Sequence, residues 1–397
     1  MRETIKTLLI DANGLTLKSI LADTLLKGTL GLSSAPPFAA RWIPYRIGQQ
    51  LWGRRNESLS YVLDWREAIC EAKELDADIC NITNLIEYRE FLRKLRQYPL
   101  IIVLHSATGD SMSLLRKRID WFRERRGKLV VFVGNEYNLL GDKINFLKSV
   151  KADYICSQLP LEVARWLYEE CVDSQILSLP HGLNPKVYFP VTRSVRKIDI
   201  GFIGDFYHHL VGDKERTHLV QFFQEEGKKY KLTCDIRSER LPRLDWAEFL
   251  RSCNGILGAE SGTYYLDRKG RQIEEARRYF KTHRGITFDE VHHLFFSGVS
   301  HGISGKAISS RHFEPIGTKT CQILIEGTYN GILKGDEHYI SLKKDLSNIE
   351  DVMRRFMDEE YRSSMVNRAY EDILSSHTYR HRVDSLLKTV VGDIPTR

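Results

Sequence analysis

The sequence predicts an α/β protein made of two doubly wound, Rossmann-like domains that face each other across a cleft. Three observations predict this fold class. The chain has 397 residues, more than the ~250–300 residues at which a single hydrophobic core usually stops growing. Short apolar runs alternate with amphipathic stretches in both halves, which is typical of parallel sheets covered on both faces. A basic, proline-bearing segment around 183–196 has no hydrophobic period and separates the halves.

The first half contains six short apolar runs that predict buried strands. These are Thr7–Ala12, Ala77–Ile82, Leu100–Leu104, Lys128–Val133, Asp153–Ser157 and Gln175–Leu179. The stretches Glu87–Gln97, Ser111–Arg126 and Pro160–Glu170 are amphipathic and predict helices between strands. We expect residues 1–185 to form the first domain and residues 186–197 to form the linker.

The second half repeats this pattern, and we expect residues 198–378 to form the second domain. Its predicted strands are Ile198–Ile203, Tyr230–Ile236, Asn254–Leu257, Gln322–Ile325 and Glu337–Leu342. A charged segment, 259–300, interrupts the alternation and predicts a helical insert. Residues 379–397 predict a helix and tail, which we expect to cross back to the first domain.

Composition limits the classes of partner. The formal charge of +7 is spread along the chain, so we expect no nucleic-acid binding. Seven cysteines form no CxxC pair, and scattered thiols fit a cytoplasmic protein. The first residues lack the apolar core of a signal peptide. Residues 38–55 interleave arginines with Trp42, Tyr45 and Trp52, which indicates either a packed loop or contact with an acceptor or a membrane surface.

The most informative stretch is 309–330. Ser309 and Ser310 can cap a helix that begins near Arg311, which would place Glu314 in its first turn. The first turn of a helix favours anions such as phosphate, and a carboxylate beside it can accept hydrogen bonds from ribose hydroxyls. A nucleotide site and a simple capped helix are both compatible with this segment.

The glycine-rich run 298–307 precedes that helix. A Walker phosphate loop would need glycine at Ser300 and a hydroxyl residue at Ala307, so the run argues against a phosphate-loop kinase. Gly305 and Lys306, together with Arg311, could hold a pyrophosphate. A flexible loop with solvated charges is the alternative.

Polar residues also follow several predicted strands, where doubly wound sheets place their ligands. They are His105, Glu136, Asp205 and Glu260, and His181 lies just before the linker. Gly204 also follows a predicted strand, where glycine lets the backbone approach a phosphate closely. Ordinary loop residues are the alternative in each case. Three pairs of histidines lie close together in the sequence, namely His208–His209, His292–His293, and His377 with His381. None has a third metal ligand nearby, so we expect no metal site.

These residues resemble the donor-binding half of GT-B-fold glycosyltransferases, and most closely the group around the CgeB spore-maturation protein. The resemblance covers about residues 175–390. It is carried by the segments Leu179–Gly182, Asp199–Gly204, Arg311–Glu314, Ile316–Thr318, Gln322–Gly327, Gly335–Tyr339 and His377–Arg382. It implies that Glu314 binds the ribose of a nucleotide sugar and that Arg311 and Gly204 face the diphosphate. Two positions depart from the family pattern, with lysine at 306 instead of glutamate and lysine at 319 instead of glycine.

This resemblance, taken with the residues above, implies a metal-independent hexosyltransferase that uses a nucleotide sugar such as a UDP-sugar as co-substrate and needs no other cofactor. The expected donor-binding residues are Glu314, Arg311, Lys306, Gly204, Gly305, Thr318, His181 and Glu260. The candidates for a general base are Glu136, His105 and Asp205. The first domain would hold the acceptor, which is a glycan, protein, lipid or small molecule. A module that binds a nucleotide or glycan without turnover is the alternative, motivated by Lys306.

Overall fold

The chain forms two compact α/β units, shown in a computed structural model that describes residues 4–12, 60–109, 112–191, 196–206, 208–283, 285–298 and 303–393. The first unit comprises Met1–Ser157, Tyr168–Leu177 and Val383–Arg397, and the second comprises Gln158–Leu167 and Ser178–Arg382. The domain limits 185 and 198 stay a prediction. The membrane-contact segment 38–55 lies outside the described residues.

The first unit is built on a six-stranded parallel sheet with the order β2-β1-β3-β4-β5-β6. Its strands are β1 (Ile5–Asp11), β2 (Leu75–Asn81), β3 (Leu100–Val103), β4 (Lys128–Phe132), β5 (Tyr154–Ser157) and β6 (Gln175–Ser178). All six predicted strands are present to within two residues at their starts. The residues of β3, Leu100–Val103, are fully buried, as expected for a strand covered on both faces.

Short helices connect these strands. They are α3 (Ser60–Cys70), α4 (Leu85–Arg93), η2 (Leu95–Gln97), α5 (His105–Thr108), α6 (Ser113–Arg116), α7 (Ile119–Arg123) and α8 (Leu140–Val150). The helix α9 (Leu161–Leu167) belongs to the second unit. The C-terminal helix α18 (Tyr379–Val390) begins in the second unit, and its residues from Val383 onward belong to the first. The Tyr154 hydroxyl donates to the carboxylate of Asp393 in η5 (Val391–Asp393), so the return of the C-terminal helix to the first unit is confirmed.

The second unit is built on a five-stranded parallel sheet with the order β11-β10-β9-β7-β8. Its strands are β7 (Ile198–Ile203), β8 (Cys234–Arg237), β9 (Cys253–Gly258), β10 (Cys321–Ile325) and β11 (Ile340–Leu342). The prediction that β8 begins at Tyr230 is wrong, because Gly227–Tyr230 forms the 3-10 helix η3. The remaining predicted strands are confirmed, although β11 is shorter than expected.

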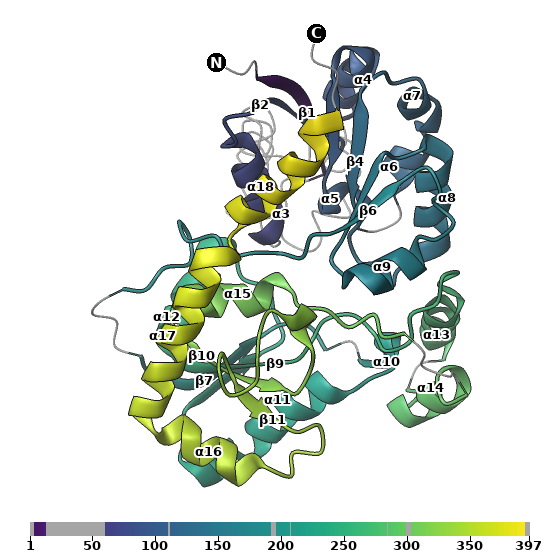
Figure 1. Cartoon of the computed structure of the whole chain (residues 1–397). Coiled ribbons are helices and arrows are strands. Elements are labelled where there is room, and N and C mark those ends of the chain that lie inside the picture. Colours follow the sequence, from purple (N-terminus) through teal and green to yellow (C-terminus); the bar gives the residue numbers. More distant parts are fainter. Residues whose placement is uncertain are drawn as a thin grey trace, which may run out of the picture. The chain divides into compact units, whose positions relative to one another are not determined.

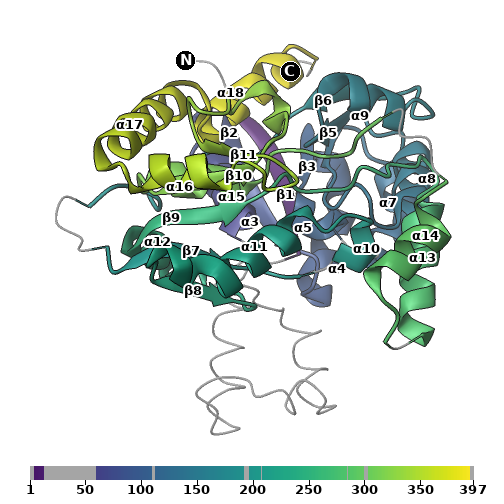
Figure 2. The same cartoon turned by 90° about the horizontal axis from the view of Figure 1, so that it is seen from below.

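Helices cover both faces of this second sheet (Figures 1 and 2). One face packs against α12 (Arg243–Ser252), α15 (Ser310–Gly317) and α17 (Glu359–Ser376). The other face packs against α11 (Glu215–Glu226) and α16 (Ile349–Met357). The short helices α10 (His208–Val211) and η4 (Tyr329–Gly331) lie in connecting loops. This is the doubly wound arrangement that the alternating pattern predicts.

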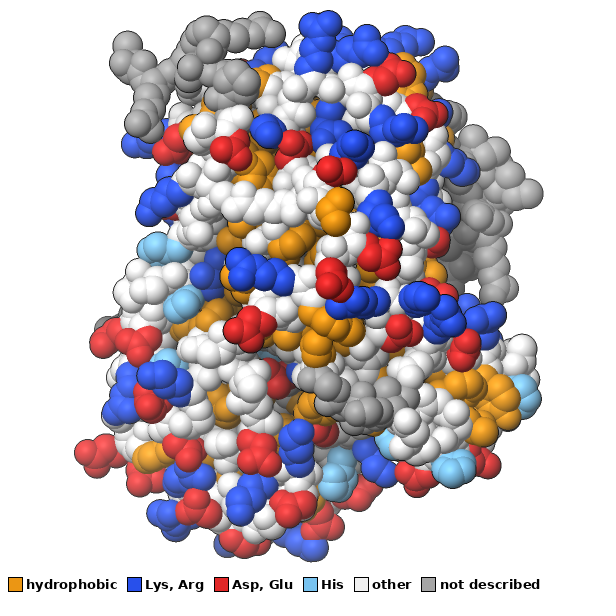
Figure 3. Space-filling view, turned by 45° about the vertical axis from the view of Figure 1, so that its right-hand side comes forward, with side chains coloured by type: hydrophobic (Ala, Val, Ile, Leu, Met, Phe, Trp, Pro, Cys, Tyr) orange, Lys and Arg blue, Asp and Glu red, His pale blue; other side chains and the backbone are white. Residues whose placement is uncertain are grey.

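The predicted insert contains two helices, α13 (Arg271–Thr282) and α14 (Phe288–Phe295), which lie side by side (Figures 1 and 2). The side chains of Thr287 and Glu290 form a capping box at the start of α14, which satisfies two orphan N–H groups. Phe280 and Leu294 of this insert are exposed, and Figure 3 shows hydrophobic side chains at the surface of this part of the second unit.

Candidate active site

The loops at the carboxyl edge of the second sheet converge on one place. The strand order reverses between β7 and β9, and doubly wound folds bind ligands outside the carboxyl ends of the strands at such a point. Gly204 follows β7 and Ala259 follows β9. The helix α15 begins at this edge, because His312 Nε2 in its first turn lies 3.2 Å from the Ala259 carbonyl oxygen. The second unit therefore brings the β7 and β9 loops and a helix N-terminus together.

Of the two predicted capping residues, Ser309 is the N-cap of α15, and Ser310 is the first residue of the helix. The prediction that Glu314 lies in the first turn is wrong, because α15 starts at Ser310 and its first turn contains no acid. Glu314 lies one turn further along the helix. In the described residues, the backbone N–H groups of Ser310 and Arg311 have no acceptor. Such groups at a helix N-terminus attract anions.

His312 fastens this helix to the β9 loop as a neutral imidazole. Its Nδ1 accepts a hydrogen bond from the Ser309 N–H at 2.9 Å, so Nε2 carries the proton that is donated to the Ala259 carbonyl. Burial lowers the pKa of His312 to about 4, from 6.5. Between these two pH values the unfolded chain binds a proton that the folded chain does not.

We therefore expect acid to weaken the second unit as the pH falls from 6.5 to about 4. The contribution of His312 to the free energy of unfolding is present above pH 6.5 and falls by about 3 kcal/mol across this window. Denaturation at several pH values should show this loss, and it should be smaller in His312→Gln. A control variant, His218→Gln, changes an exposed histidine on α11. An NMR titration in which the His312 ring protonates near pH 6.5 would contradict the prediction.

Arg311, Glu314 and Trp246 form a stacked cluster beside the start of α15. The Arg311 guanidinium lies over the Trp246 ring, 4.0 Å from its centroid. Trp246 Nε1 donates to Glu314 Oε2 at 2.6 Å, and Arg311 Nε lies 3.9 Å from the same oxygen. Glu314 is 1% exposed. Arg311 Nη1 is buried and has no hydrogen-bond acceptor among the described residues, so this guanidinium retains an unused donor.

Lys306 is held inside the second unit by acidic residues that lie far away in the sequence. Its Nζ lies 2.8 Å from Asp213 Oδ2 and 3.9 Å from Glu215 Oε2, and its side chain is 4% exposed. Tyr264 donates to Glu215 Oε1 at 2.8 Å. The exposed Lys344 also pairs with this oxygen, at 2.9 Å. Both ammonium groups lie over the Tyr264 ring. The charge of Lys306 is therefore largely compensated within the unit.

A short strap around Gly305 joins the β9 loop to α15. Ser261 and Ala307 exchange two backbone hydrogen bonds of 2.9 Å, and the Gly305 N–H donates to the Thr263 carbonyl at 2.9 Å. Gly262 has φ +91°, and a Cβ there would lie 2.1 Å from the Gly305 carbonyl oxygen. The N–H groups of Gly305 and Ala307 therefore already have acceptors, so these two groups help to position α15 and are not free to bind a phosphate.

Glu260 fastens a third loop to the same edge. Its Oε1 accepts from the Tyr329 N–H at 2.6 Å and from the Thr328 hydroxyl at 3.1 Å. Both donors lie in the segment after β10. Three of the predicted donor-binding side chains, those of Glu260, Lys306 and Glu314, therefore contact groups of the protein itself at this edge.

The other predicted residues of the second unit lie in different surroundings. Gly204 follows β7, and a Cβ there would lie 3.3 Å from the Phe202 ring. Asp205 is held by Arg240 through two hydrogen bonds. Thr318 is the C-cap of α15, about 12 Å along the helix from its N-terminus by helical rise, so the structure does not bring it to the start of α15. Burial and nearby Arg382 lower the pKa of His181 to about 3, which keeps its ring neutral.

In the first unit, His105 and Glu136 follow neighbouring strands. His105 is 1% exposed and is surrounded by the rings of Trp65 and Phe132, at centroid distances of 5.8 and 5.1 Å. Glu136 Oε1 accepts from the hydroxyls of Ser157 and Tyr168, both at 2.7 Å. The loops that carry them touch, because a Cβ on Gly134 would lie 3.4 Å from His105 Cβ. The structure thus brings these two candidates to one edge of the first sheet.

The described residues contain no group of three or more histidine, cysteine, aspartate or glutamate residues arranged to hold a metal ion. Within the same part of the chain, no helix has the length and apolar content needed to span a bilayer.

Known proteins share this architecture. Residues 239–388 match the family model described as glycosyl transferase-like. Sucrose-phosphate synthase from Thermosynechococcus elongatus has a TM-score of 0.50 and 9% identity, covering 98% of this chain and all of that chain. A phage T4 enzyme, BGT in complex with its UDP-glucose substrate, has a TM-score of 0.50 and 11% identity, covering 97% and 99% of the two chains. The chain has the GT-B fold. A search of curated sequences gives no significant match.

The GT-B fold confirms the predicted fold class, whereas the CgeB-like subgroup stays a prediction. The matched region contains α12, α15 and β10, and therefore the Trp246, Arg311 and Glu314 cluster. It does not contain Asp213 or Glu215, which hold Lys306 and which the sequence reasoning missed. Asp213 lies 93 positions before Lys306, so no local pattern could have paired them. Trp246 was missed because a tryptophan on an amphipathic helix indicates only a core position.

Proposed function

We propose that this GT-B chain transfers a sugar, of the hexose type, from a nucleotide-diphosphate donor to an acceptor. One observation carries the proposal. At the N-terminus of α15, two backbone N–H groups and Arg311 Nη1 have no acceptor among the described residues. These three donors lie at the carboxyl edge of the second sheet, within the segment that matches a glycosyl transferase-like model. A diphosphate would supply the acceptors that they lack.

This arrangement suits the chemistry of a leaving nucleoside diphosphate. Negative charge grows on the diphosphate as the bond to the sugar breaks. Fixed N–H groups and a guanidinium can stabilise that charge without reorganising during the reaction. Arg311 is pre-oriented by stacking on Trp246, so little side-chain entropy is lost when it binds. We propose that these groups act without a metal ion.

Glu314 is the residue that we propose for the ribose. Its carboxylate is oriented by the Trp246 indole N–H, and it lies one turn from the proposed diphosphate site. Arg311 lies beside it, so a donor that draws Arg311 toward its phosphates would uncover the carboxylate. We propose that the acceptor binds in the first unit, where His105 and Glu136 stay candidates for the general base, together with Asp205 of the second unit.

A donor panel tests this function. The phage T4 enzyme is described with UDP-glucose, so UDP-sugars are the first donors to try, followed by GDP-sugars. We expect release of the nucleoside diphosphate from one sugar donor, at a rate that rises when the matching acceptor is added. Binding of a nucleotide with no release across the whole panel would instead support the alternative, a module without turnover. At position 306 this chain has a lysine where the family pattern has a glutamate, and Asp213 compensates the charge of that lysine. This difference is the observation that favours the alternative.

Arg311→Ala isolates the diphosphate contact. A hydrogen bond to a charged group contributes about 1.5–3 kcal/mol, so we expect UDP affinity to fall by roughly 10- to 100-fold. Uridine affinity should change little, because uridine has no phosphate. Isothermal titration calorimetry with UDP, UMP and uridine measures this. The matched control is Arg368→Ala, which removes an exposed arginine from α17. Equal losses for UDP and uridine would show that Arg311 does not contact the phosphates.

A further inference from the structure

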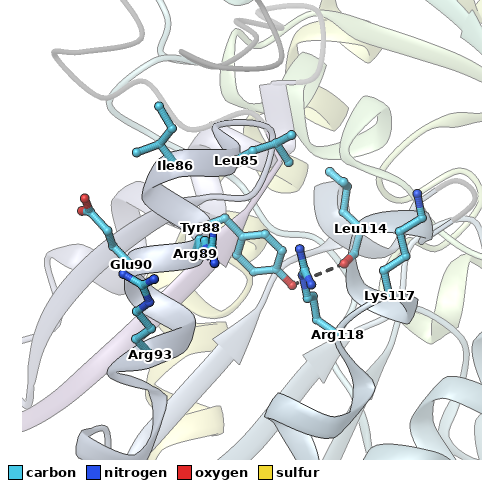
Figure 4. Close-up of a pocket in the computed structure, with 9 residues that line it drawn as sticks. All are labelled: Leu85, Ile86, Tyr88, Arg89, Glu90, Arg93, Leu114, Lys117 and Arg118. Carbon is cyan, nitrogen blue, oxygen red and sulfur yellow. Dashed lines mark hydrogen bonds between the residues drawn. The ribbon is translucent and has the colours of Figure 1, made fainter.

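A basic cavity lies on the first unit, apart from the loops that carry His105 and Glu136. It has a volume of about 510 Å³ and lies between α4 and the segment 114–118 (Figure 4). Its lining residues are Leu85, Ile86, Tyr88, Arg89, Glu90, Arg93, Leu114, Lys117 and Arg118. We call this cavity the α4 groove. Its volume lies within the range of roughly 300–1,000 Å³ that is common for ligand sites.

The floor of the α4 groove is fixed. Tyr88 is 3% exposed, and its hydroxyl lies 3.5 Å from the Leu114 carbonyl oxygen, which ties α4 to the opposite wall. The helix α4 itself is anchored at its start, because the Asn84 side chain accepts from the Glu87 N–H. The positively charged side chains around the groove therefore project from two segments that Tyr88 links.

The walls of the α4 groove carry four cations and one carboxylate. Arg89 and Arg93 come from α4, and Lys117 and Arg118 come from the opposite wall, whereas Glu90 is the single acid. All five side chains are exposed. No carboxylate in the described parts of the chain lies within ion-pair distance of any of the four cations.

Two cations just outside the α4 groove do have carboxylate partners. Arg116, one residue before Lys117, pairs with Asp142 at 2.6 Å, and Arg96 pairs with Glu124 at 2.5 Å. These two nearby cations therefore have carboxylate partners, whereas the four cations of the groove have none among the described residues. Four cations without an ion-pair partner, set against the single carboxylate of Glu90, leave an excess of positive charge around one concave surface, which raises the local potential and attracts an anion.

Two aliphatic side chains complete the α4 groove. Leu85 and Ile86, in the first turn of α4, are 40% and 52% exposed. Both line the cavity and extend from the same end of α4 in Figure 4. Exposed aliphatic residues beside cations are a combination that binds the interface of a membrane, where apolar side chains reach the acyl boundary and cations contact the headgroups. A soluble phosphate compound would use the cations but not Leu85 and Ile86.

We propose that the α4 groove binds the headgroup of an anionic phospholipid and so holds the protein at a membrane surface. Arg89, Arg93, Lys117 and Arg118 contact the phosphate, while Leu85 and Ile86 enter the acyl boundary. The site needs no nucleotide sugar, so it is independent of the proposed function. It is also separate from residues 38–55, on which the sequence-based expectation of membrane contact rests.

Vesicle co-sedimentation of the complete chain tests this proposal. The vesicles contain phosphatidylcholine alone or phosphatidylcholine with phosphatidylglycerol. We expect binding to the anionic vesicles only, weakened by salt because exposed charges are screened beyond about 10 Å at 0.1 M. Arg93→Glu with Arg118→Glu should lower the partition constant by roughly tenfold or more, since each surface cation contributes appreciably to anionic-membrane binding. Leu85→Ser with Ile86→Ser should also weaken binding.

The matched control is Lys73→Glu with Arg126→Glu, which makes the same charge change at exposed positions outside the groove. Thermal unfolding confirms that each variant is folded. Equal losses in the groove and control variants would show nonspecific charge attraction and overturn the proposal. Absence of binding to anionic vesicles would also overturn it. If inorganic tripolyphosphate stabilises the wild type but not the groove variant, and vesicles do not bind, the groove is a soluble-phosphate site instead.

Discussion

Lys306→Met should destabilise the second unit by about 3–5 kcal/mol, because removing one partner of a buried ion pair leaves the other charge uncompensated. Lys306 is 4% exposed, and its partner Asp213 is 13% exposed. In the variant, the Asp213 carboxylate would face Glu215 with no cation at 2.8 Å. Denaturant unfolding of the complete chain measures the loss, read as a shift of the transition midpoint.

A double-mutant cycle makes this prediction specific. Asp213→Asn removes the stranded charge, so Lys306→Met with Asp213→Asn should recover much of the stability that the single lysine variant loses. Lys344→Met is the matched control, because Lys344 belongs to the same cluster but its side chain is 46% exposed. We expect it to have a small effect. If Lys306→Met and Lys344→Met lower the free energy of unfolding by the same amount, the buried Lys306–Asp213 pair does not stabilise the second unit more than an exposed pair does.

Lys143→Met should destabilise the first unit by a comparable amount, about 3 kcal/mol or more. Lys143 is fully buried in α8. Its Nζ donates to the carbonyl oxygens of Gly134, Asn135 and Gly109, the last two at 2.9 and 3.2 Å. Methionine fills a similar volume but leaves these buried carbonyls without this donor. Thermal and denaturant unfolding of the complete chain measure the loss.

The same helix offers the control. Lys148, five residues later on α8, is exposed and pairs with Glu170 at 2.7 Å. Lys148→Met should change stability little, because an exposed ion pair contributes little. Hydrogen exchange provides a second measurement, because Lys143 donates to the carbonyl oxygens of Gly134 and Asn135, the residues just before Glu136. Hydrogen exchange of the 134–136 segment should therefore speed up in Lys143→Met and not in Lys148→Met. Matching behaviour of the two variants would contradict a structural role for Lys143.

Lys143 also illustrates a signal that the sequence contained. On α8, Leu140, Leu147 and Val150 are buried, and Lys143 falls on the same helical stripe, three residues after the first of them. A lysine in an apolar stripe is an exception that indicates a buried partner. Its partners are backbone carbonyls of the loop just before α8 and of Gly109 in a more distant loop, and no pattern of side chains identifies those.

At the candidate site, too, a local feature was predictable from the sequence. The start of α15 was predictable, because serine before a helical pattern is a local signal, and Ser309 is indeed the N-cap. The helix begins at Ser310, one residue before the predicted start at Arg311, and this difference moves Glu314 out of the first turn. Helix ends are the least certain part of a sequence-based assignment, because neighbouring cap positions differ by only a fraction of a kcal/mol in many cases.

The sequence by itself determined the alternation of strands and helices, the two sheets and the capped helix α15, because these features depend on the local period of apolar residues and on local hydrogen bonds. Only the tertiary structure decided which charges are compensated. Lys306 forms an ion pair with Asp213, and Glu314 accepts a hydrogen bond from Trp246. The cations of the α4 groove form no ion pair with a carboxylate among the described residues. The reason is physical: an ion pair or a stacked guanidinium depends on distances of a few ångströms between residues far apart in the chain, and no local period records those distances.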